Sequence, residues 1–238
     1  MTTTRDESLA WVRDGTRRLL ADLASLSDGE LDAPTILPGW TRRHLLAHVA
    51  ANADALRNLV YWARTGEERR MYSSPGQRAA DIEKGATRPA AELRDWGARS
   101  AAELDADFAG LPEAAWDAKV ITAQGLTRPA REIPWMRARE VYVHAVDLGA
   151  GTRFADLPPV FLTALLDDVA ARRSSAGTGS ALSLTAADTG ATWQVSGTGA
   201  SRAITASLPA LAGWLTGRLA TGLRDSAGVP APDLPAWL

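Results

Sequence analysis

The sequence predicts an α+β protein of two domains, a four-helix bundle over residues 1–151 and a small α+β domain over residues 152–238. Long segments of the first part place apolar residues at helical spacing. The composition then changes, because residues 174–207 carry only two formal charges, Asp188 and Arg202, among Ser, Thr, Gly and Ala. The length of 238 residues and the 46% hydrophobic content are sufficient for two cores.

The first two helices have clear sequence limits. An apolar pattern over residues 6–26 predicts the first helix, and the turn-rich segment SDGELDAPTILPGW follows it. We expect the second helix over residues 42–65. Thr41 is suited to cap its N-terminus, and Gly66 can end it in a left-handed conformation.

The rest of the predicted bundle contains a third helical stretch and a fourth helix. Ser-Pro at residues 74–75 can start the third stretch, and Gly85 is a candidate break within it. The segment AKVITAQGLTRP has β-branched residues around a glycine and predicts a short extended excursion. The fourth helix is expected over residues 130–148, with Pro134 in its first turn and Gly149 after its end.

The second part predicts helices around a small sheet. The segment DLPPVFLTALLDDVAARRSS has an amphipathic helical pattern, and PALAGWLTGRL predicts a closing helix. Between them, ALSLTA, TWQVSG and AITASL alternate as strands separated by turns that contain glycine. We expect the proline-rich tail to be extended, with Trp237 and Leu238 pinning it to the body.

Charge and cysteine usage exclude several functional classes. The net charge is −2 with scattered basic residues, which argues against a nucleic-acid partner. No apolar run is long enough to span a bilayer and no signal peptide is evident, so we expect a cytoplasmic protein. The two-domain pattern leads us to expect a monomer. The absence of cysteine excludes a disulfide framework, an internal thiol nucleophile and a cysteine-based zinc site.

The few histidines fall in a pattern that could bind a metal. His44, His48 and Asn52 repeat every four residues in the second helix, and Glu140 and His144 are four apart in the fourth. Facing helices of a bundle can combine such pairs into a metal site, and two histidines with one glutamate are typical of catalytic zinc. Exposed pairs and ordinary buried hydrogen bonds give the same spacing, and spacing alone favours that alternative.

Three segments favour the metal site over that alternative, because they resemble a known family. The segments LPGWTRRHLLAHVAANADALRNLVYWARTGEERRMYSSP, LTRPAREIPWMRAREVYVHAVDLG and LTGRLATGL with PAPDLPAWL look like the mycothiol-dependent maleylpyruvate isomerase family. The resemblance spans nearly the whole chain and implies a DinB-like bundle at its N-terminus. It also implies that zinc, or another divalent metal, is held by His48, Glu140 and His144. The AHVA pattern selects His48, which leaves His44 as a capping or supporting residue.

The resemblance further implies the reaction. Members isomerise 3-maleylpyruvate to 3-fumarylpyruvate in gentisate degradation, with mycothiol as the thiol cofactor. A metal-bound thiolate would then replace the nucleophile that the cysteine-free chain lacks. The family's essential arginine near the C-terminus corresponds here to Arg218, the expected catalytic residue. Arg78 is a weaker candidate for binding a substrate carboxylate, and a solvated charge is the simpler interpretation of it.

Two other functions remain open at this point. A mycothiol S-transferase that detoxifies electrophiles would use the same metal-bound thiolate. A ligand-binding protein without catalytic activity could instead have a purely structural His/Glu cluster. Some aromatic residues could line a pocket for the sugar-containing thiol, but their helical spacing favours the core for most of them. These are Trp62, Tyr72, Trp135 and Tyr142.

Overall fold

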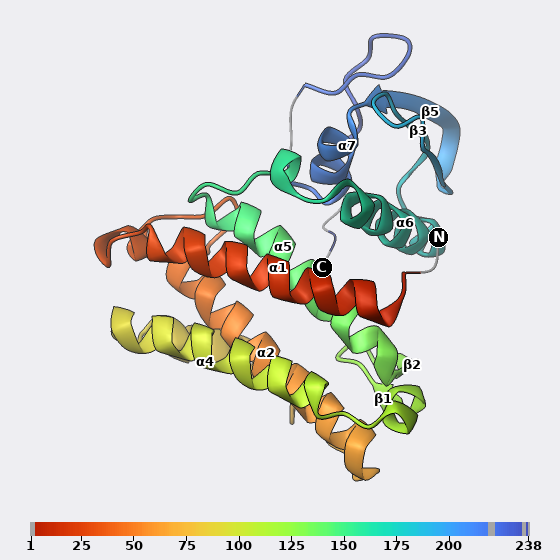
Figure 1. The fold of residues 1–238 in the computed structure, drawn as a ribbon. Helices are drawn as coiled ribbons and strands as arrows, with labels where there is room; N and C mark the ends of the chain where they lie inside the picture. Colours follow the sequence, from red (N-terminus) through yellow and green to blue (C-terminus); the bar gives the residue numbers. More distant parts are fainter. Residues whose placement is uncertain (1–2, 219–221, 235–236, 238) are drawn as a thin grey trace. The chain divides into compact units, whose positions relative to one another are not determined.

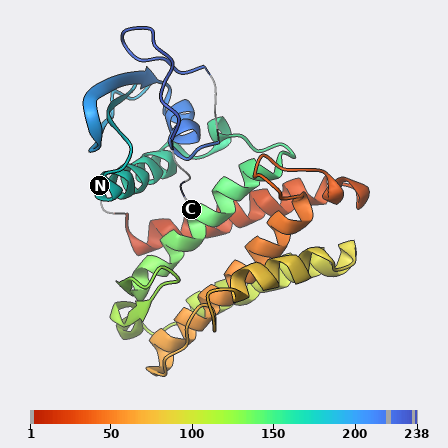
Figure 2. The same cartoon turned by 180° about the vertical axis from the view of Figure 1, so that it is seen from behind.

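The chain folds into two compact units in a computed structural model that describes residues 3–218, 222–234 and 237 (Figures 1 and 2). The N-terminal unit comprises Thr3–Thr152, and the C-terminal unit begins at Arg153. Helices dominate both units and each contains a small sheet, so the predicted α+β class is confirmed. Among the described residues, no helix is both long and apolar enough to cross a membrane.

The N-terminal unit is a bundle of long helices with one short helix and a hairpin. Helix α1 packs along α5, and α2 packs against α3, α4 and α5 (Figure 1). A two-stranded antiparallel hairpin lies between α4 and α5 in the chain, where an extended excursion was expected. The elements are α1 (Arg5–Ala24), α2 (Arg42–Thr65), α3 (Gln77–Ala86), α4 (Ala90–Ala109), β1 (Lys119–Ile121), β2 (Thr127–Pro129) and α5 (Ile133–Leu148), with short 3₁₀ turns at Gly29–Asp32, Glu113–Asp117 and Ala130–Glu132.

The limits of α2 agree with those expected from the sequence. Thr41 is the N-cap residue, and its side chain and that of His44 form a reciprocal capping box. Gly66 ends the helix with φ of +77°, a left-handed conformation that glycine adopts without steric cost. Gly149 ends α5 in the same way with φ of +64°. Local capping interactions therefore determine where α2 begins and ends and where α5 ends. These two helices carry the candidate metal ligands.

The third helical stretch differs from the expectation. It is two helices, and α3 begins at Gln77 after Gly76 rather than at residues 74–75. The break falls just before Pro89 instead of at Gly85. Proline lacks the N–H that a helix needs and disfavours helical geometry in the residue before it, which accounts for the break.

Gly85 has a packing role inside α3. A Cβ atom there would lie 2.7 Å from the Ala47 Cβ and 2.7 Å from Cζ3 of Trp96. Glycine therefore allows α3 to lie against α2 and α4 more closely than any other residue would. The fourth predicted helix also begins later than expected, because a 3₁₀ turn occupies Ala130–Glu132 before α5.

Aliphatic side chains from all four long helices form the core of the N-terminal unit. Trp40, which precedes α2, packs against this core from the loop. The buried members are Leu19, Leu23, Leu31, Leu45, Leu46, Ala47, Val49, Ala50, Ala51, Ala90, Leu93, Trp96, Val141, Ala145 and Leu148. This packing holds α2 and α5 side by side, which is what the candidate site requires.

The C-terminal unit packs two helices with a three-stranded sheet. The strand order is β4-β3-β5, with β3 antiparallel to β4 and parallel to β5. Leu184 of the central strand pairs with Trp193 and with Ile204, and all three side chains are buried. The elements are a 3₁₀ turn at Phe154–Asp156, α6 (Pro159–Ala176), β3 (Ser180–Ala186), β4 (Thr192–Val195), β5 (Thr198–Ala206) and α7 (Leu208–Leu215). Trp237 is buried as expected, whereas Leu238 lies outside the described residues.

The role of Gly85 leads to a stability prediction. Gly85→Val should lower the free energy of unfolding by about 2 kcal/mol, because the new side chain would overlap Ala47 and the Trp96 ring, neither of which can yield easily. Chemical denaturation measures this change. Gly76→Ser on the same helix is the control, since its Cβ would point into open space. Equal stability of the Gly85→Val and Gly76→Ser proteins would contradict the packing role.

Candidate metal centre

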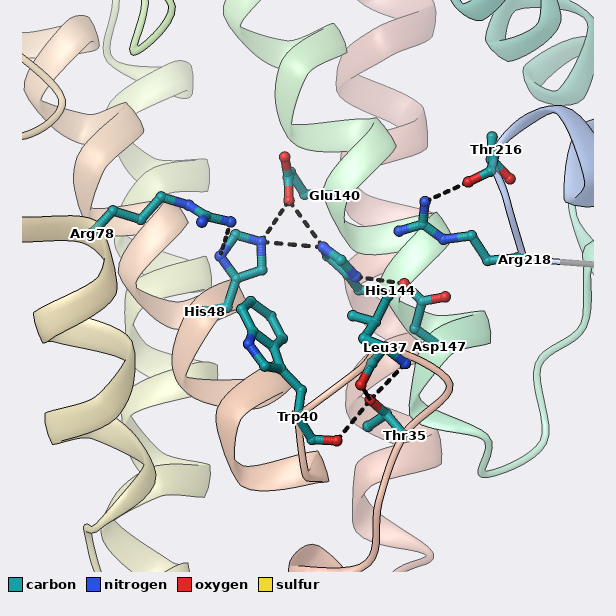
Figure 3. A network of polar contacts seen from close by, with 10 residues as sticks. All are labelled: Thr35, Leu37, Trp40, His48, Arg78, Glu140, His144, Asp147, Thr216 and Arg218. Atoms are coloured by element: carbon teal, nitrogen blue, oxygen red, sulfur yellow. Dashed lines mark hydrogen bonds and ion pairs between the residues drawn. The ribbon is translucent and has the colours of Figure 1, made fainter. Parts of the chain in front are cut away.

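The three expected ligands converge on one point between α2 and α5 (Figure 3). His48 comes from α2, and Glu140 and His144 come from successive turns of α5. The Nε2 atom of His48 lies 2.9 Å from Oε2 of Glu140 and 3.1 Å from Nε2 of His144. The remaining distance, between the Glu140 Oε2 and the His144 Nε2, is 3.2 Å. The three atoms therefore form a nearly equilateral triangle.

The triangle has the dimensions of a metal-ligand set. Ligand atoms around a tetrahedral zinc ion are about 3.3 Å apart, since zinc–nitrogen and zinc–oxygen distances are about 2.0–2.2 Å. Two imidazole nitrogens and one carboxylate oxygen are ligands that zinc accepts, and other divalent transition metals accept them too. Three protein ligands leave a further coordination position for a small molecule. The arrangement therefore fits a catalytic rather than a closed structural metal site.

Burial and neighbouring groups together determine the charges of the first two ligands. It lowers the pKa of His48 to about 4, against the opposing effect of the Glu140 carboxylate, so His48 is neutral near pH 7. A neutral imidazole is the form that binds a metal. For Glu140, burial favours the protonated form, but hydrogen bonds to His144 and His48 and their charges outweigh it and hold its pKa well below the usual range. Glu140 is therefore a carboxylate.

His144 lies between two carboxylates. Burial acts to lower its pKa, but Asp147 and Glu140 together raise that pKa above its ordinary value. The site thus favours a positive charge at this imidazole. A divalent cation bound to the triangle would supply that charge and would balance the carboxylates of Glu140 and Asp147.

Asp147 is a functional residue that the sequence analysis missed. Its Oδ2 atom lies 2.8 Å from Nδ1 of His144, and its side chain is fully buried. A carboxylate on one imidazole nitrogen directs the other nitrogen toward a metal and increases its basicity. The signal was present in the sequence, because Asp147 follows His144 by three residues and so shares its side of α5.

Arg137 connects the two helices that carry the ligands. Its side chain is 1% exposed, and its Nη1 atom donates hydrogen bonds of 2.8 Å to the Val49 carbonyl and to Oδ1 of Asn52. Burial lowers the pKa of Arg137 to about 10, so the guanidinium stays charged near pH 7. Arg137 lies one turn before Glu140 and therefore fixes α5 against α2 beside the ligands. Asn52, which shares the four-residue spacing of His44 and His48, takes part in this contact through its Oδ1.

His44 and Trp40 support the start of α2. The Nδ1 atom of His44 accepts from the Thr41 backbone N–H at 3.2 Å and lies 2.8 Å from its hydroxyl oxygen, which confirms the capping role. Trp40 lies against the ligand itself, with its ring centre 5.4 Å from that of His48 (Figure 3). The Thr35 hydroxyl donates a hydrogen bond of 3.0 Å to the Trp40 carbonyl and so stabilises the loop that contains Trp40.

The two candidate arginines belong to different units. Arg78, in the first turn of α3, places Nη2 3.4 Å from Nδ1 of His48, so it borders the ligand triangle although its side chain is exposed. Arg218 follows α7 in the C-terminal unit. Its Nη1 donates to the Thr216 carbonyl at 2.7 Å, and its guanidinium lies 5.6 Å from the centre of the Trp237 ring. Gly217, with φ of +78°, makes the turn that leads to it.

The fold and the site together define a helical bundle with a His₂Glu cluster that could hold a metal ion, and the comparisons identify its family. Residues 12–149 match the family model described as mycothiol maleylpyruvate isomerase N-terminal domain. The crystal structure of the mycothiol-dependent maleylpyruvate isomerase shares 38% identity with this chain, covers 100% of both chains and superposes with a TM-score of 0.94. The chain belongs to the mycothiol maleylpyruvate isomerase family.

Further comparisons agree with this assignment. A second structure of that enzyme, a mutant with one histidine replaced by alanine, gives the same TM-score of 0.94. YfiT from Bacillus subtilis, described as a probable metal-dependent hydrolase with an unusual four-helix bundle topology, has a TM-score of 0.52 and 15% identity over 61% of this chain and 83% of its own. It supports the fold alone. Among curated proteins, none matches the sequence significantly.

Family membership confirms the predicted isomerase class and leaves the non-enzymatic alternative without support.

The triangle makes a direct prediction about metal content. His48→Ala, Glu140→Ala and His144→Ala should each bind far less than one zinc per chain, because two remaining ligands do not hold the ion. Elemental analysis after dialysis measures the content. His44→Ala should retain the metal, since His44 caps α2 outside the triangle. Full zinc retention in all three ligand variants would refute the site.

The contact with Asp147 makes a second prediction. Asp147→Asn preserves the side-chain shape but removes the charge, so zinc affinity should fall by roughly 10- to 100-fold. Competition with a chelator measures the affinity, and a thermal melt checks the fold. Unchanged zinc affinity in a folded Asp147→Asn protein would show that His144 needs no carboxylate partner.

Proposed function

We propose that the chain catalyses the mycothiol-dependent cis–trans isomerisation of 3-maleylpyruvate to 3-fumarylpyruvate, a step of gentisate degradation. The observation that carries the proposal is the full-length similarity to a mycothiol-dependent maleylpyruvate isomerase, at 38% identity. The His48–Glu140–His144 triangle supplies the metal-binding chemistry that such a reaction can use.

The ligand set suits activation of an external thiol. Bound zinc would supply a positive centre that accepts the mycothiol sulfur and stabilises it as a thiolate near neutral pH. The chain contains no cysteine, so a thiol nucleophile has to come from a cofactor. His48, Glu140 and His144 would hold the ion, while Asp147 would orient His144 and Trp40 would shield the His48 ring from water.

The reaction needs a temporary single bond. Addition of the thiolate to one carbon of the cis double bond moves an electron pair toward the conjugated carbonyl oxygen and leaves a bond that can rotate. Elimination of the thiolate then restores the double bond in the trans form and regenerates the cofactor. Atoms and charge balance without an oxidant or reductant. The protein must therefore stabilise a developing negative oxygen and hold the substrate carboxylates.

Two arginines are proposed for these tasks. Arg218 is assigned as the catalytic arginine, in accordance with the family resemblance, because a guanidinium can bind a carboxylate or an enolate oxygen through two donors. The C-terminal domain would thus contribute a substrate-site residue. Arg78 is proposed as a carboxylate ligand, since its exposed guanidinium borders His48, and its contacts with His48 and Tyr72 leave other N–H groups available.

The proposal is tested by following maleylpyruvate optically with purified, zinc-loaded protein. Conversion to fumarylpyruvate only in the presence of mycothiol is the expected result. Absence of conversion by protein that holds zinc would contradict the proposal. Conjugation of mycothiol to a reactive electrophile under the same conditions would then favour the S-transferase alternative, which uses the same metal-bound thiolate.

The role of Arg218 gives a separate prediction. Arg218→Ala should keep its zinc but lose turnover by roughly 100-fold, the magnitude typical of removing one group that stabilises a developing oxyanion. Zinc content and initial rates measure the two effects. Arg224→Ala is the matched control, because Arg224 is an exposed arginine of the same unit whose Nη1 donates only to the nearby Gly228 carbonyl among the bonds described. Normal turnover of Arg218→Ala would assign the role to another residue.

A further inference from the structure

The N-terminal unit contains a polar cavity next to the ligand triangle that the proposed chemistry does not use. Its volume is about 290 Å³, and it lies between α2, α3 and α4. Ala51, Asp54 and Asn58 of α2 line it, and they follow His48 by three, six and ten residues. At 1.5 Å per residue, the near edge of the cavity is about 5 Å from His48 along the helix axis.

Tyr72 and the start of α3 join the cavity to the metal centre. Tyr72 and Gln77 line the cavity, and Arg78, the next residue, contacts His48. Tyr72 also interacts electrostatically with both Arg78 and Glu140. Tyr72 is one of the four aromatic residues that the sequence analysis named as candidates to line a pocket, and the structure leaves it half-exposed at this boundary.

The polar groups of the cavity suit an uncharged ligand rich in hydroxyl groups. Carboxylates of Asp54 and Asp81 face it together with the cations of Lys84 and Arg88, so the four formal charges cancel. Acceptors and donors are therefore both available, as a polyol requires, and the lining has no net positive charge that would favour a dicarboxylate. Trp96 also lines the cavity, with a ring that is largely buried.

Several of these side chains already have partners, and two do not. Asp54 accepts from Nε1 of Trp96 at 2.8 Å, and Arg88 stacks over the same ring at 4.2 Å from its centre. Within the described part of the chain, no hydrogen bond or ion pair engages the charged ends of Asp81 or Lys84. These two groups on α3 are free to contact a ligand.

We propose that this cavity binds the sugar–cyclitol part of the thiol cofactor, while the cofactor sulfur lies at the His48–Glu140–His144 triangle. This inference rests on the proposed use of mycothiol, an uncharged cysteine derivative whose amide carries a sugar joined to a cyclitol. Five bonds separate the sulfur from the first sugar ring, a span of about 6 Å from ordinary bond lengths. The span exceeds the rise of about 5 Å along α2 from His48 to Ala51, the first residue of that helix to line the cavity.

The test measures binding without catalysis. S-methylmycothiol, which cannot form a thiolate, is titrated calorimetrically into metal-free protein. The wild type should bind it, and the double variant Asp81→Ala/Lys84→Ala should bind it about tenfold more weakly, as expected for two lost hydrogen bonds. Lys119→Ala is the control, because Lys119 is the other lysine of the chain and lies exposed on β1.

Each outcome decides the inference. Failure of the wild type to bind, or equal affinities of wild type and double variant, would overturn it. A tenfold loss in the double variant with none in Lys119→Ala would support it, even if maleylpyruvate isomerisation failed, because calorimetry does not depend on the substrate. Isomerase activity with unchanged thiol binding in the double variant would preserve the proposed function and place the sugar elsewhere.

Discussion

The packing of α2 against α5 is the constraint on which the candidate metal centre depends. One ligand lies on α2 and two lie on α5, so a shift of either helix by one residue would move an imidazole by about 1.5 Å along the axis and rotate it by about 100°. The Arg137 guanidinium opposes such a shift, because it is buried and binds two oxygen atoms of α2. Apolar packing brings the helices together, and this polar contact fixes their register.

The same arrangement has an energetic cost in the absence of a cation. Two imidazoles and two carboxylates meet with little access to water, and burying charged groups is unfavourable unless they are paired. A proton on His144 satisfies the carboxylates in part, and a divalent metal would satisfy them more completely. A protein selected only for stability would fill this space with aliphatic side chains, so the cluster is better explained by function.

Much of the site was predictable because its determinants are local. The i, i+4 spacing of Glu140 and His144 places both on one side of a helix, and Thr41 and Gly66 mark the ends of the helix that carries His48. The resemblance to the family selected His48 over His44, and the structure brings the Nε2 of His48, not His44, within 3.1 Å of the other two ligand atoms. Spacing alone did not distinguish the two histidines.

The features that were missed depend on contacts between distant segments. Nothing local distinguishes Arg137 from the exposed arginines of the chain until α2 presents a carbonyl and an amide to it. Gly85 was taken as a break because glycine weakens isolated helices, yet its role appears only when Ala47 and Trp96 lie against it. Spacing favoured the core for most of the four candidate aromatic residues and did not single out Tyr72, which lies at a cavity edge.

The central claim, that the triangle holds a metal with a position open to a thiol, is tested most directly by X-ray absorption at the zinc edge. The zinc-loaded protein should show only nitrogen and oxygen neighbours at about 2.0–2.2 Å. Addition of mycothiol should introduce one sulfur neighbour at about 2.3 Å. A spectrum that does not change with mycothiol, from protein that retains zinc, would contradict the claim.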